Sequence, residues 1–150
     1  MILNWTCKTF YELSLEELYT ILRLRNEVFV VEQNCPYQDL DYKDQQSLHL
    51  GGWDGTNLVA YTRLLPPGLS FKEASIGRVV TSPSYRATGA GRELMTRSIE
   101  TAFTKFGCSS IRIGAQVYLT KFYQSLGFEP ASAEYLEDNI PHIEMLLKKI

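Results

Sequence analysis

The chain has 150 residues, of which 45% are apolar and 21% are charged, and its formal net charge is -2. This length fits a single domain spanning residues 1–150 with an ordinary hydrophobic core. The slightly negative charge argues against a nucleic-acid-binding protein. The three cysteines include no CxxC pair, so neither a disulfide framework nor a metal site is expected.

The N-terminal sequence MILNWTCKTF has neither a basic start nor a long apolar run, so it does not look like a signal peptide. No segment is long and apolar enough for a transmembrane helix. The expectation is therefore a cytoplasmic protein without membrane attachment.

The first third of the chain predicts a strand, a helix and a loop. Residues 3–10 read as a short strand, and residues 14–33 follow a helical apolar period. Ser14 and Glu17 have the spacing of a capping box. The β-branched residues of VFVV are expected to loosen the end of this helix. The polar, turn-rich stretch NCPYQDLDYKDQQ is predicted to be a loop.

The next segment, SLHLGGWDGTNLVAYTRLL, predicts two strands joined by a hairpin at Asp54-Gly55. A third strand is predicted in EASIGRVVTSP. GRELMTRSIETAFTKFG predicts a long helix that stops at Gly107.

The last third predicts a strand in SSIRIGAQ, a helix in LTKFYQSLGF that ends at Gly127, and a final strand around residues 143–147. The order of elements indicates an α+β fold, with one central sheet flanked by helices. An edge strand near the C-terminus would allow pairing with a second copy, so a homodimer is possible.

The stretch YRATGAGREL, residues 85–94, connects a predicted strand to the long helix. Helix N-termini attract anions, and Gly89 and Gly91 leave room for a ligand to approach the backbone closely. The loop lacks the lysine of a Walker A motif, and Leu94 stands where a dinucleotide fingerprint needs a third glycine. A plain glycine turn with Thr88 as the helix N-cap remains an open alternative.

Arg-x-x-Gly-x-Gly followed by FYQSLGF resembles the GNAT N-acetyltransferase superfamily. FVVEQNCPYQDLD, IGRV, IGAQ and IPHIEM extend the likeness over residues 29–145 and are similar to the ElaA-like family within it. The resemblance implies a GNAT-like fold, acetyl-CoA as the acetyl donor, and direct transfer to a primary amine of a small molecule or peptide.

The resemblance also implies roles for individual residues. Val80 would donate its backbone N–H to the thioester carbonyl, Val79 and Thr81 would flank the pantetheine arm, and Tyr123 would be the general acid. The residues that would contact the pyrophosphate are Arg86, Thr88, Gly89, Ala90, Gly91 and Arg92, and weaker cofactor contacts are expected from Gln116 and Phe122.

The general base is not evident from the sequence. Many relatives carry a glutamate on the strand before the glycine loop, whereas this chain has Arg78 there, and Glu73 lies at the start of the strand. His49 and His142 have a suitable intrinsic pKa. A structural role for each histidine and a water relay both remain open.

The acceptor site is predicted in the acidic loop, because residues 27–44 hold five acidic residues and a single basic residue, Lys43. Such a rim attracts an amine, and the residues chosen for the acceptor are Glu32, Gln33, Tyr37 and Asp39. A solvated loop whose acids cap turns is the alternative. Cys35 has no activating neighbour in the sequence, so an inert thiol is expected.

Three other functions compete with acetyl transfer. A non-catalytic acyl-CoA-binding regulatory module would use the same loop. A nucleotide-binding or phosphotransfer domain is disfavoured by the missing loop lysine. A protein that keeps only the fold is the third.

Overall fold

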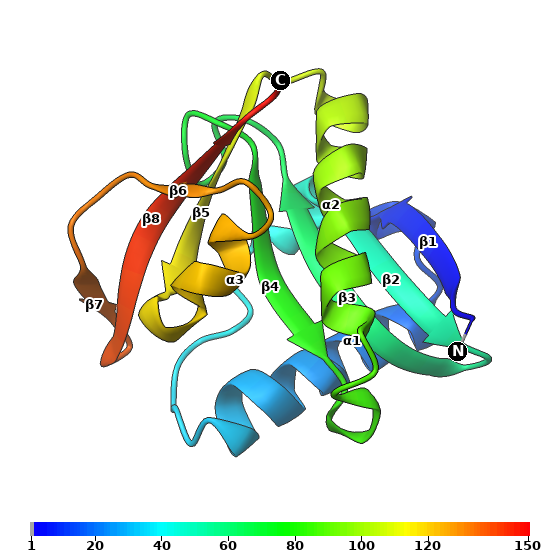
Figure 1. Ribbon diagram of the computed structural model, residues 1–150. Coiled ribbons are helices and arrows are strands. Elements are labelled where there is room, and N and C mark those ends of the chain that lie inside the picture. Colours follow the sequence, from blue (N-terminus) through cyan, green and yellow to red (C-terminus); the bar gives the residue numbers. More distant parts are fainter. Residues whose placement is uncertain (1) are drawn as a thin grey trace.

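The computed structural model describes residues 2–150 as an α+β fold with two four-stranded sheets (Figure 1). The strands of the first sheet are antiparallel, in the order β1 (Asn4–Thr9), β2 (Leu48–Asp54), β3 (Asn57–Leu65) and β4 (Ser75–Thr81). The second sheet contains β5 (Ser110–Gln116), β8 (Ile140–Lys148), β6 (Glu129–Pro130) and β7 (Tyr135–Glu137).

The two sheets meet where β4 and β5 begin and separate further along. An isolated parallel bridge joins Ala74 to Ile111, and the N–H of Arg112 donates to the carbonyl of Ala74 at 2.9 Å. Beyond this point β4 and β5 run in the same direction and diverge (Figure 1). The α+β fold expected from the sequence is thus confirmed, with its strands divided between two sheets that this bridge joins.

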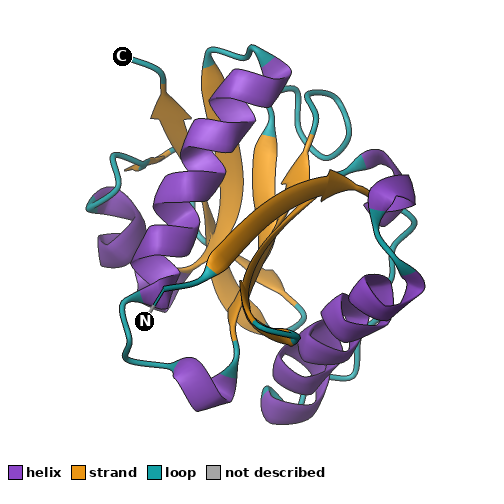
Figure 2. Ribbon diagram, turned by 90° about the vertical axis from the view of Figure 1, so that its right-hand side faces the viewer, coloured by secondary structure: helices purple, strands orange, loops and turns teal. Residues whose placement is uncertain are grey.

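Helix α1 (Leu15–Arg25) covers one face of the first sheet, and α2 (Ala90–Phe106) lies on the opposite side (Figure 2). The short helix α3 (Thr120–Gln124) lies on the α2 side, beside β5 (Figure 1). Single 3₁₀ turns occupy Phe10–Glu12, Asp44–Gln46, Pro83–Tyr85 and Val117–Leu119.

The start and end of the first helix agree with the sequence prediction. Glu17 N donates to Ser14 Oγ at 3.0 Å, and Ser14 N donates to Glu17 Oε1 at 2.8 Å, which completes the capping box. After Arg25 the helix widens over Asn26–Glu32, where Gln33 N bonds to the carbonyl five residues earlier. Crowding by the β-branched residues explains this looser turn.

Two hydrophobic clusters fix the helices on the sheets. On the α2 side, Met95 and Ala102 pack with Leu64 of the first sheet and with Ile111 and Met145 of the second. This cluster therefore holds the two sheets together. On the other side, Ile21, Leu24 and Val28 pack against Trp53, Tyr61 and Val80.

Three details of the structure bear on the predictions for the hairpin turn, for an edge strand near the C-terminus and for membrane helices. Asp54 pairs with Asn57, so the hairpin turn is Gly55–Thr56 and not Asp54-Gly55. Strand β8 is paired with β5 on one side and with β6 and β7 on the other, so it offers no free edge to a second copy. Within residues 2–150, no helix combines the length and apolar character needed to cross a membrane.

Candidate functional site

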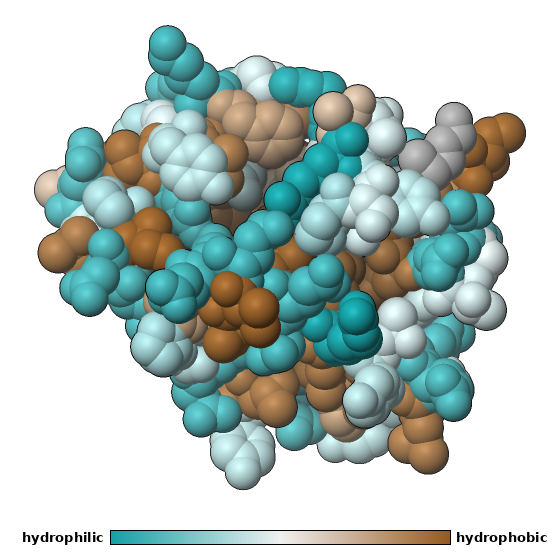
Figure 3. All heavy atoms as spheres, turned by 90° about the horizontal axis from the view of Figure 1, so that it is seen from below, coloured by the Kyte–Doolittle hydropathy of each residue, from teal (hydrophilic) through white to brown (hydrophobic). Residues whose placement is uncertain are grey.

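A cleft of about 940 Å³ opens where β4 and β5 diverge. One wall is formed by β4 with the loop after α1, and the other by β5 with the β7–β8 hairpin. Figure 3 shows the molecule from below, with the surface hollowed and hydrophilic side chains bordering the hollow. This volume is in the range of sites that enclose a cofactor-sized ligand.

The backbone of β4 presents alternate N–H groups to the cleft. Val80 is paired with Tyr61 of β3, and Ser82 N donates to Val59 O at 2.7 Å. Antiparallel strands exchange hydrogen bonds at every second residue, so the N–H of Val80 also points toward β3. The N–H groups of Val79 and Thr81 point the opposite way, into the cleft. The N–H of Val80 is therefore directed away from the cleft, contrary to the role predicted for it.

A β-bulge explains why the sequence misled on this point. The register between β3 and β4 shifts between Tyr61 and Arg63, and Arg78 adopts a left-handed φ of +51°. One additional residue in β4 reverses the alternation along the strand. Such a bulge is recognised only from the pairing of β4 with β3, which the sequence alone does not give. The left-handed arginine stores strain of roughly 1–3 kcal/mol, which the contacts of its side chain must offset.

The N-terminus of α2 lies at the end of β4, where the predicted phosphate loop is found. Gly89 is the N-cap residue with φ +82°, and no side chain caps the helix. A left-handed residue followed by a helical one makes successive N–H groups converge into an anion-binding concavity. Thr88 donates its hydroxyl to Tyr85 O at 2.7 Å, so the alternative with Thr88 as N-cap is wrong.

The arginines of this loop have protein partners. Arg86 lines the cleft and donates to Glu32 through two nitrogens, one at 3.0 Å. Arg92 donates to Ser125 Oγ at 2.7 Å, and its guanidinium lies 5.5 Å from the ring centroid of Phe122. The cleft is not lined by Thr88, Gly89, Ala90, Gly91, Arg92 or Phe122, but Gly91 lies beside Thr81, which does line it.

If this loop holds the pyrophosphate of CoA, as the resemblance implies, replacing Gly91 by Ala should weaken CoA binding about tenfold and leave the fold intact. A Cβ at this position would meet only Thr81 Oγ1 at 3.7 Å, an ordinary contact, so the loss would come from the ligand. Titration with CoA by calorimetry, together with a thermal melt, measures both. Unchanged affinity would show that the ligand does not approach Gly91. The same change at Gly89 is less informative, because its φ of +82° strains any other residue.

Tyr123 lies on α3 with its hydroxyl at the cleft. The side chain is 6% exposed and packs edge-on against Phe122 and Phe128, at centroid distances of 5.3 and 5.9 Å. Burial raises the pKa of Tyr123 to about 12. Its hydroxyl makes no hydrogen bond to another residue in the range 2–150. A protonated phenol without a protein partner is thus available as a hydrogen-bond donor.

His142 also lines the cleft, on the opposite face of the second sheet. It pairs with Gln116, and side chains on this strand alternate, so His142 and Gln116 point away from the face where Tyr123 packs. His142 Nδ1 lies 2.7 Å from Ile140 O. A carbonyl only accepts, so Nδ1 is the donor in this contact and Nε2 is the ring nitrogen left without a hydrogen bond within residues 2–150. Nε2 lies 3.6 Å from Glu137 Oε2.

His49 lies in the interior and not at the cleft. It is 2% exposed, with Nδ1 2.6 Å from Tyr61 Oη and Nε2 2.9 Å from Asp44 O. Burial lowers its pKa, which favours the neutral ring. With both nitrogens occupied, His49 has no site for an incoming proton. His49 is therefore not placed to act as the general base, and its choice as a candidate is corrected: its strand turns this side toward α1, away from the cleft.

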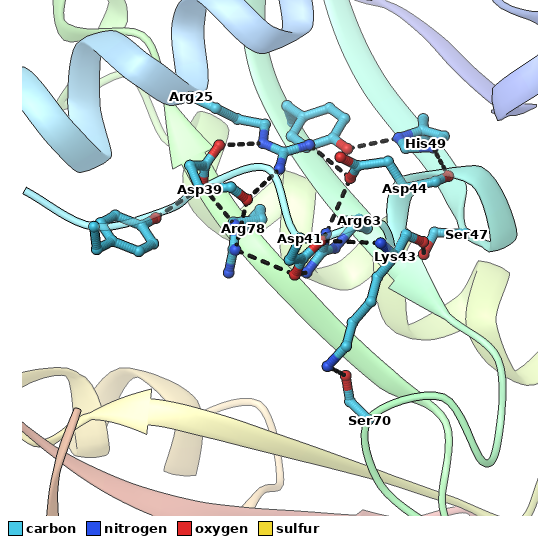
Figure 4. A network of polar contacts seen from close by, with 12 residues as sticks. Arg25, Asp39, Asp41, Lys43, Asp44, Ser47, His49, Arg63, Ser70 and Arg78 are labelled. Carbon is cyan, nitrogen blue, oxygen red and sulfur yellow. Dashed lines mark hydrogen bonds and ion pairs between the residues drawn. The ribbon is translucent and has the colours of Figure 1, made fainter. Parts of the chain in front are cut away.

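The acids of the predicted acceptor loop are largely neutralised by arginines from other elements (Figure 4). Asp39 is 7% exposed and contacts Arg25 Nε at 3.0 Å and Arg78 Nε at 2.7 Å. It therefore does not reach the cleft, and its choice as an acceptor residue is corrected. The ion pairs that complete this network are Arg25–Asp44, Arg63–Asp44, Arg63–Asp41 and Arg78–Asp41.

The other predicted acceptor residues do line the cleft, namely Glu32, Gln33 and Tyr37. Tyr37 donates its hydroxyl to Asp39 Oδ1 at 2.8 Å, so the ring is tied to the network. Cys35 lines the cleft too, with Sγ 3.7 Å from Asp138 O. Glu73 is held outside by Arg112 at 3.2 Å.

Several cleft residues were missed from the sequence. Arg63 lies on a strand and is not among the predicted site residues, and the residues of the β7–β8 hairpin, Tyr135, Glu137 and Asp138, belong to no motif. The available signal was Arg25, a charged residue on the apolar stripe of a helix. A buried arginine requires carboxylate partners.

Comparison with known proteins identifies the family. The model of the acetyltransferase (GNAT) domain matches residues 13–149. The chain belongs to the GNAT acetyltransferase family. Escherichia coli protein ElaA is 42% identical over 146 residues, covering 96% of this chain and 95% of ElaA. A UPF0039 protein from Synechocystis is 40% identical over 149 residues, covering 99% and 97%.

Solved GNAT structures agree with the fold. The crystal structure of an acyl-CoA N-acyltransferase from Pseudomonas aeruginosa superposes with a TM-score of 0.92 at 44% identity, covering 97% of this chain and 99% of that one. The crystal structure of E. coli ElaA gives 0.92 at 41% identity, covering 98% and 100%. The GNAT domain implies an acyl-CoA donor.

Proposed function

We propose that the protein transfers an acetyl group directly from acetyl-CoA to a primary amine. The observation that carries the proposal is the arrangement of the cleft, which has an anion-binding helix end at one end and free polar groups on both sides. A bound thioester would supply the activated acyl group. The chain's own residues would hold it, polarise its carbonyl and move the protons.

Donor binding rests on backbone groups. The N–H of Val79 faces the cleft and can donate to the thioester carbonyl, and that of Thr81 can donate to the adjacent arm. The converging N–H groups at Gly89 and Ala90 suit a pyrophosphate. Arg86 would add charge once its pair with Glu32 opens. Exposed ion pairs of this kind contribute little free energy, so the exchange costs little.

The two faces of the cleft suit the two proton transfers. His142 Nε2 can accept the proton that the amine loses as its nitrogen bonds to the carbonyl carbon. Tyr123 can donate to the sulfur as the carbon–sulfur bond breaks, on the other face. Base and acid then stand on opposite sides of the reacting carbon, as attack and departure require.

The test combines binding and turnover. Thermal melts with CoA and with ATP are measured alongside CoA thiol release on a panel of amines and peptides. We expect CoA to stabilise the protein, ATP not to, and at least one amine to give turnover. Stabilisation by CoA without turnover would favour the acyl-CoA-binding regulatory module. Stabilisation by ATP alone would exclude acyl transfer.

Replacing His142 by Gln is expected to reduce kcat about 100-fold, because a glutamine side chain cannot accept the proton that the amine loses. The kcat of both proteins is measured with the same acceptor. The variant should keep its thermal shift with CoA. An unchanged kcat would assign the proton transfer to water.

A further inference from the structure

One positively charged side chain of the cleft, that of Lys43, forms no ion pair with any residue of the described chain. The network below α1 contains three arginines, Arg25, Arg63 and Arg78, which the carboxylates of Asp39, Asp41 and Asp44 balance. Lys43 adds a fourth cation. Its Nζ donates to Ser70 Oγ at 2.9 Å and forms no ion pair within residues 2–150.

The excess charge faces the cleft. Lys43, Arg63, Arg78 and Ser70 all line it. Figure 4 shows the Lys43 side chain extending from the network toward Ser70. The side chain of Arg63 is 4% exposed, and its Nε is buried without a hydrogen-bond partner. Its Nη1 and Nη2 donate to Asp41 and Asp44, so the charge of Arg63 is balanced within the network.

The opposite wall has the reverse character. Glu137 and Asp138 lie on the β7–β8 hairpin and make no ion pair with Lys or Arg in the described residues. His142 lies beside Glu137. A cationic wall thus faces an acidic wall across one cleft, on the side of the sheets away from α2 and α3.

We infer that the acceptor carries a carboxylate as well as its amine, as a small amino-acid-like molecule does. The carboxylate would lie against Lys43 and Arg78, with Ser70 as a further donor. The amine would lie toward Glu137 and His142, where it would lose its proton. This inference rests on the proposed function and specifies its substrate class.

The experiment compares L-amino acids with the corresponding L-amino acid amides, which keep the side chain and the α-amine but lack the negative charge. For wild type we expect a higher kcat/KM with the acid form. In Lys43→Gln, kcat/KM for the acid should fall about 10- to 100-fold while that for the amide is unchanged. Comparing the ratio between proteins cancels the different pKa values of the two amines. Lys43→Arg should restore most of the preference.

Lys72→Gln is the matched control, since Lys72 is exposed and does not line the cleft. It should leave both values unchanged. Ser70→Ala provides a second probe if Lys43→Gln folds poorly, with a smaller loss of the same sign. Equal turnover of acids and amides, unaffected by Lys43→Gln, would overturn this inference and leave amine acetylation standing. A lack of turnover on every amine would instead count against the proposed function.

Discussion

Replacing Asp44 by Asn is expected to cost about 3–5 kcal/mol of folding free energy, the usual effect of breaking a buried ion network. Asp44 is 6% exposed and contacts Arg25 Nη1 at 2.8 Å and Arg63 Nη1 at 3.0 Å. The amide would leave two buried guanidinium groups short of one counter-charge. Total stabilities are about 5–15 kcal/mol, so the loss is a large fraction. Urea unfolding measures it.

The pH dependence gives an independent check. Burial alone would raise the pKa of Asp44, but the hydrogen bonds and charges of Arg25 and Arg63 outweigh it and lower the pKa below its ordinary value. A lowered folded-state pKa adds stability above the unfolded value of about 4, and this is lost as the pH falls through the folded value. The variant should therefore lose part of the wild-type acid sensitivity.

The exposed helix pair Glu93–Arg97 provides the control for this prediction. Both side chains are 46% exposed, so Glu93→Gln should leave the unfolding midpoint unchanged. A loss below about 1 kcal/mol in Asp44→Asn would show that water reaches the network and screens it.

Local features were readable from the sequence because nearby residues determine them. The capping box of Ser14 and Glu17, the stop of α2 at Gly107 and the looser turn after Arg25 all depend on neighbours within five positions. The family resemblance predicted the overall fold, which these local signals alone do not, because it combines motifs such as the glycine loop and FYQSLGF that lie about thirty residues apart.

Long-range features were not readable. The acids of residues 27–44 looked like an open rim because their arginine partners lie on α1, β3 and β4. The direction of the Val80 N–H depends on a bulge that only pairing with β3 reveals. The sequence does not distinguish His49 from His142 as a candidate base. In the structure His49 lies in the interior, whereas His142 lines the cleft.

Replacing Tyr123 by Phe is expected to lower kcat about 100-fold, in the range seen when one transition-state donor is removed. The side chain is 6% exposed and the change removes a single oxygen, so packing against Phe128 is retained. The pKa of about 12 keeps the phenol protonated at neutral pH, which is the form that can donate to the departing sulfur. The affinity for CoA should stay the same. Steady-state kinetics and calorimetry with CoA test both parts.

Tyr118→Phe is the matched control, because Tyr118 lines the same cleft but is 76% exposed. An exposed hydroxyl exchanges its hydrogen bonds with water, so its loss should change kcat little. A large effect at Tyr118 together with a small one at Tyr123 would assign the role of general acid to Tyr118, in the 3₁₀ turn Val117–Leu119. Small effects at both would mean that the thiolate leaves without a protein donor. An alkyl thiol titrates near 8.5, so a CoA thiolate can leave without first being protonated. The rate would then depend on neither phenol.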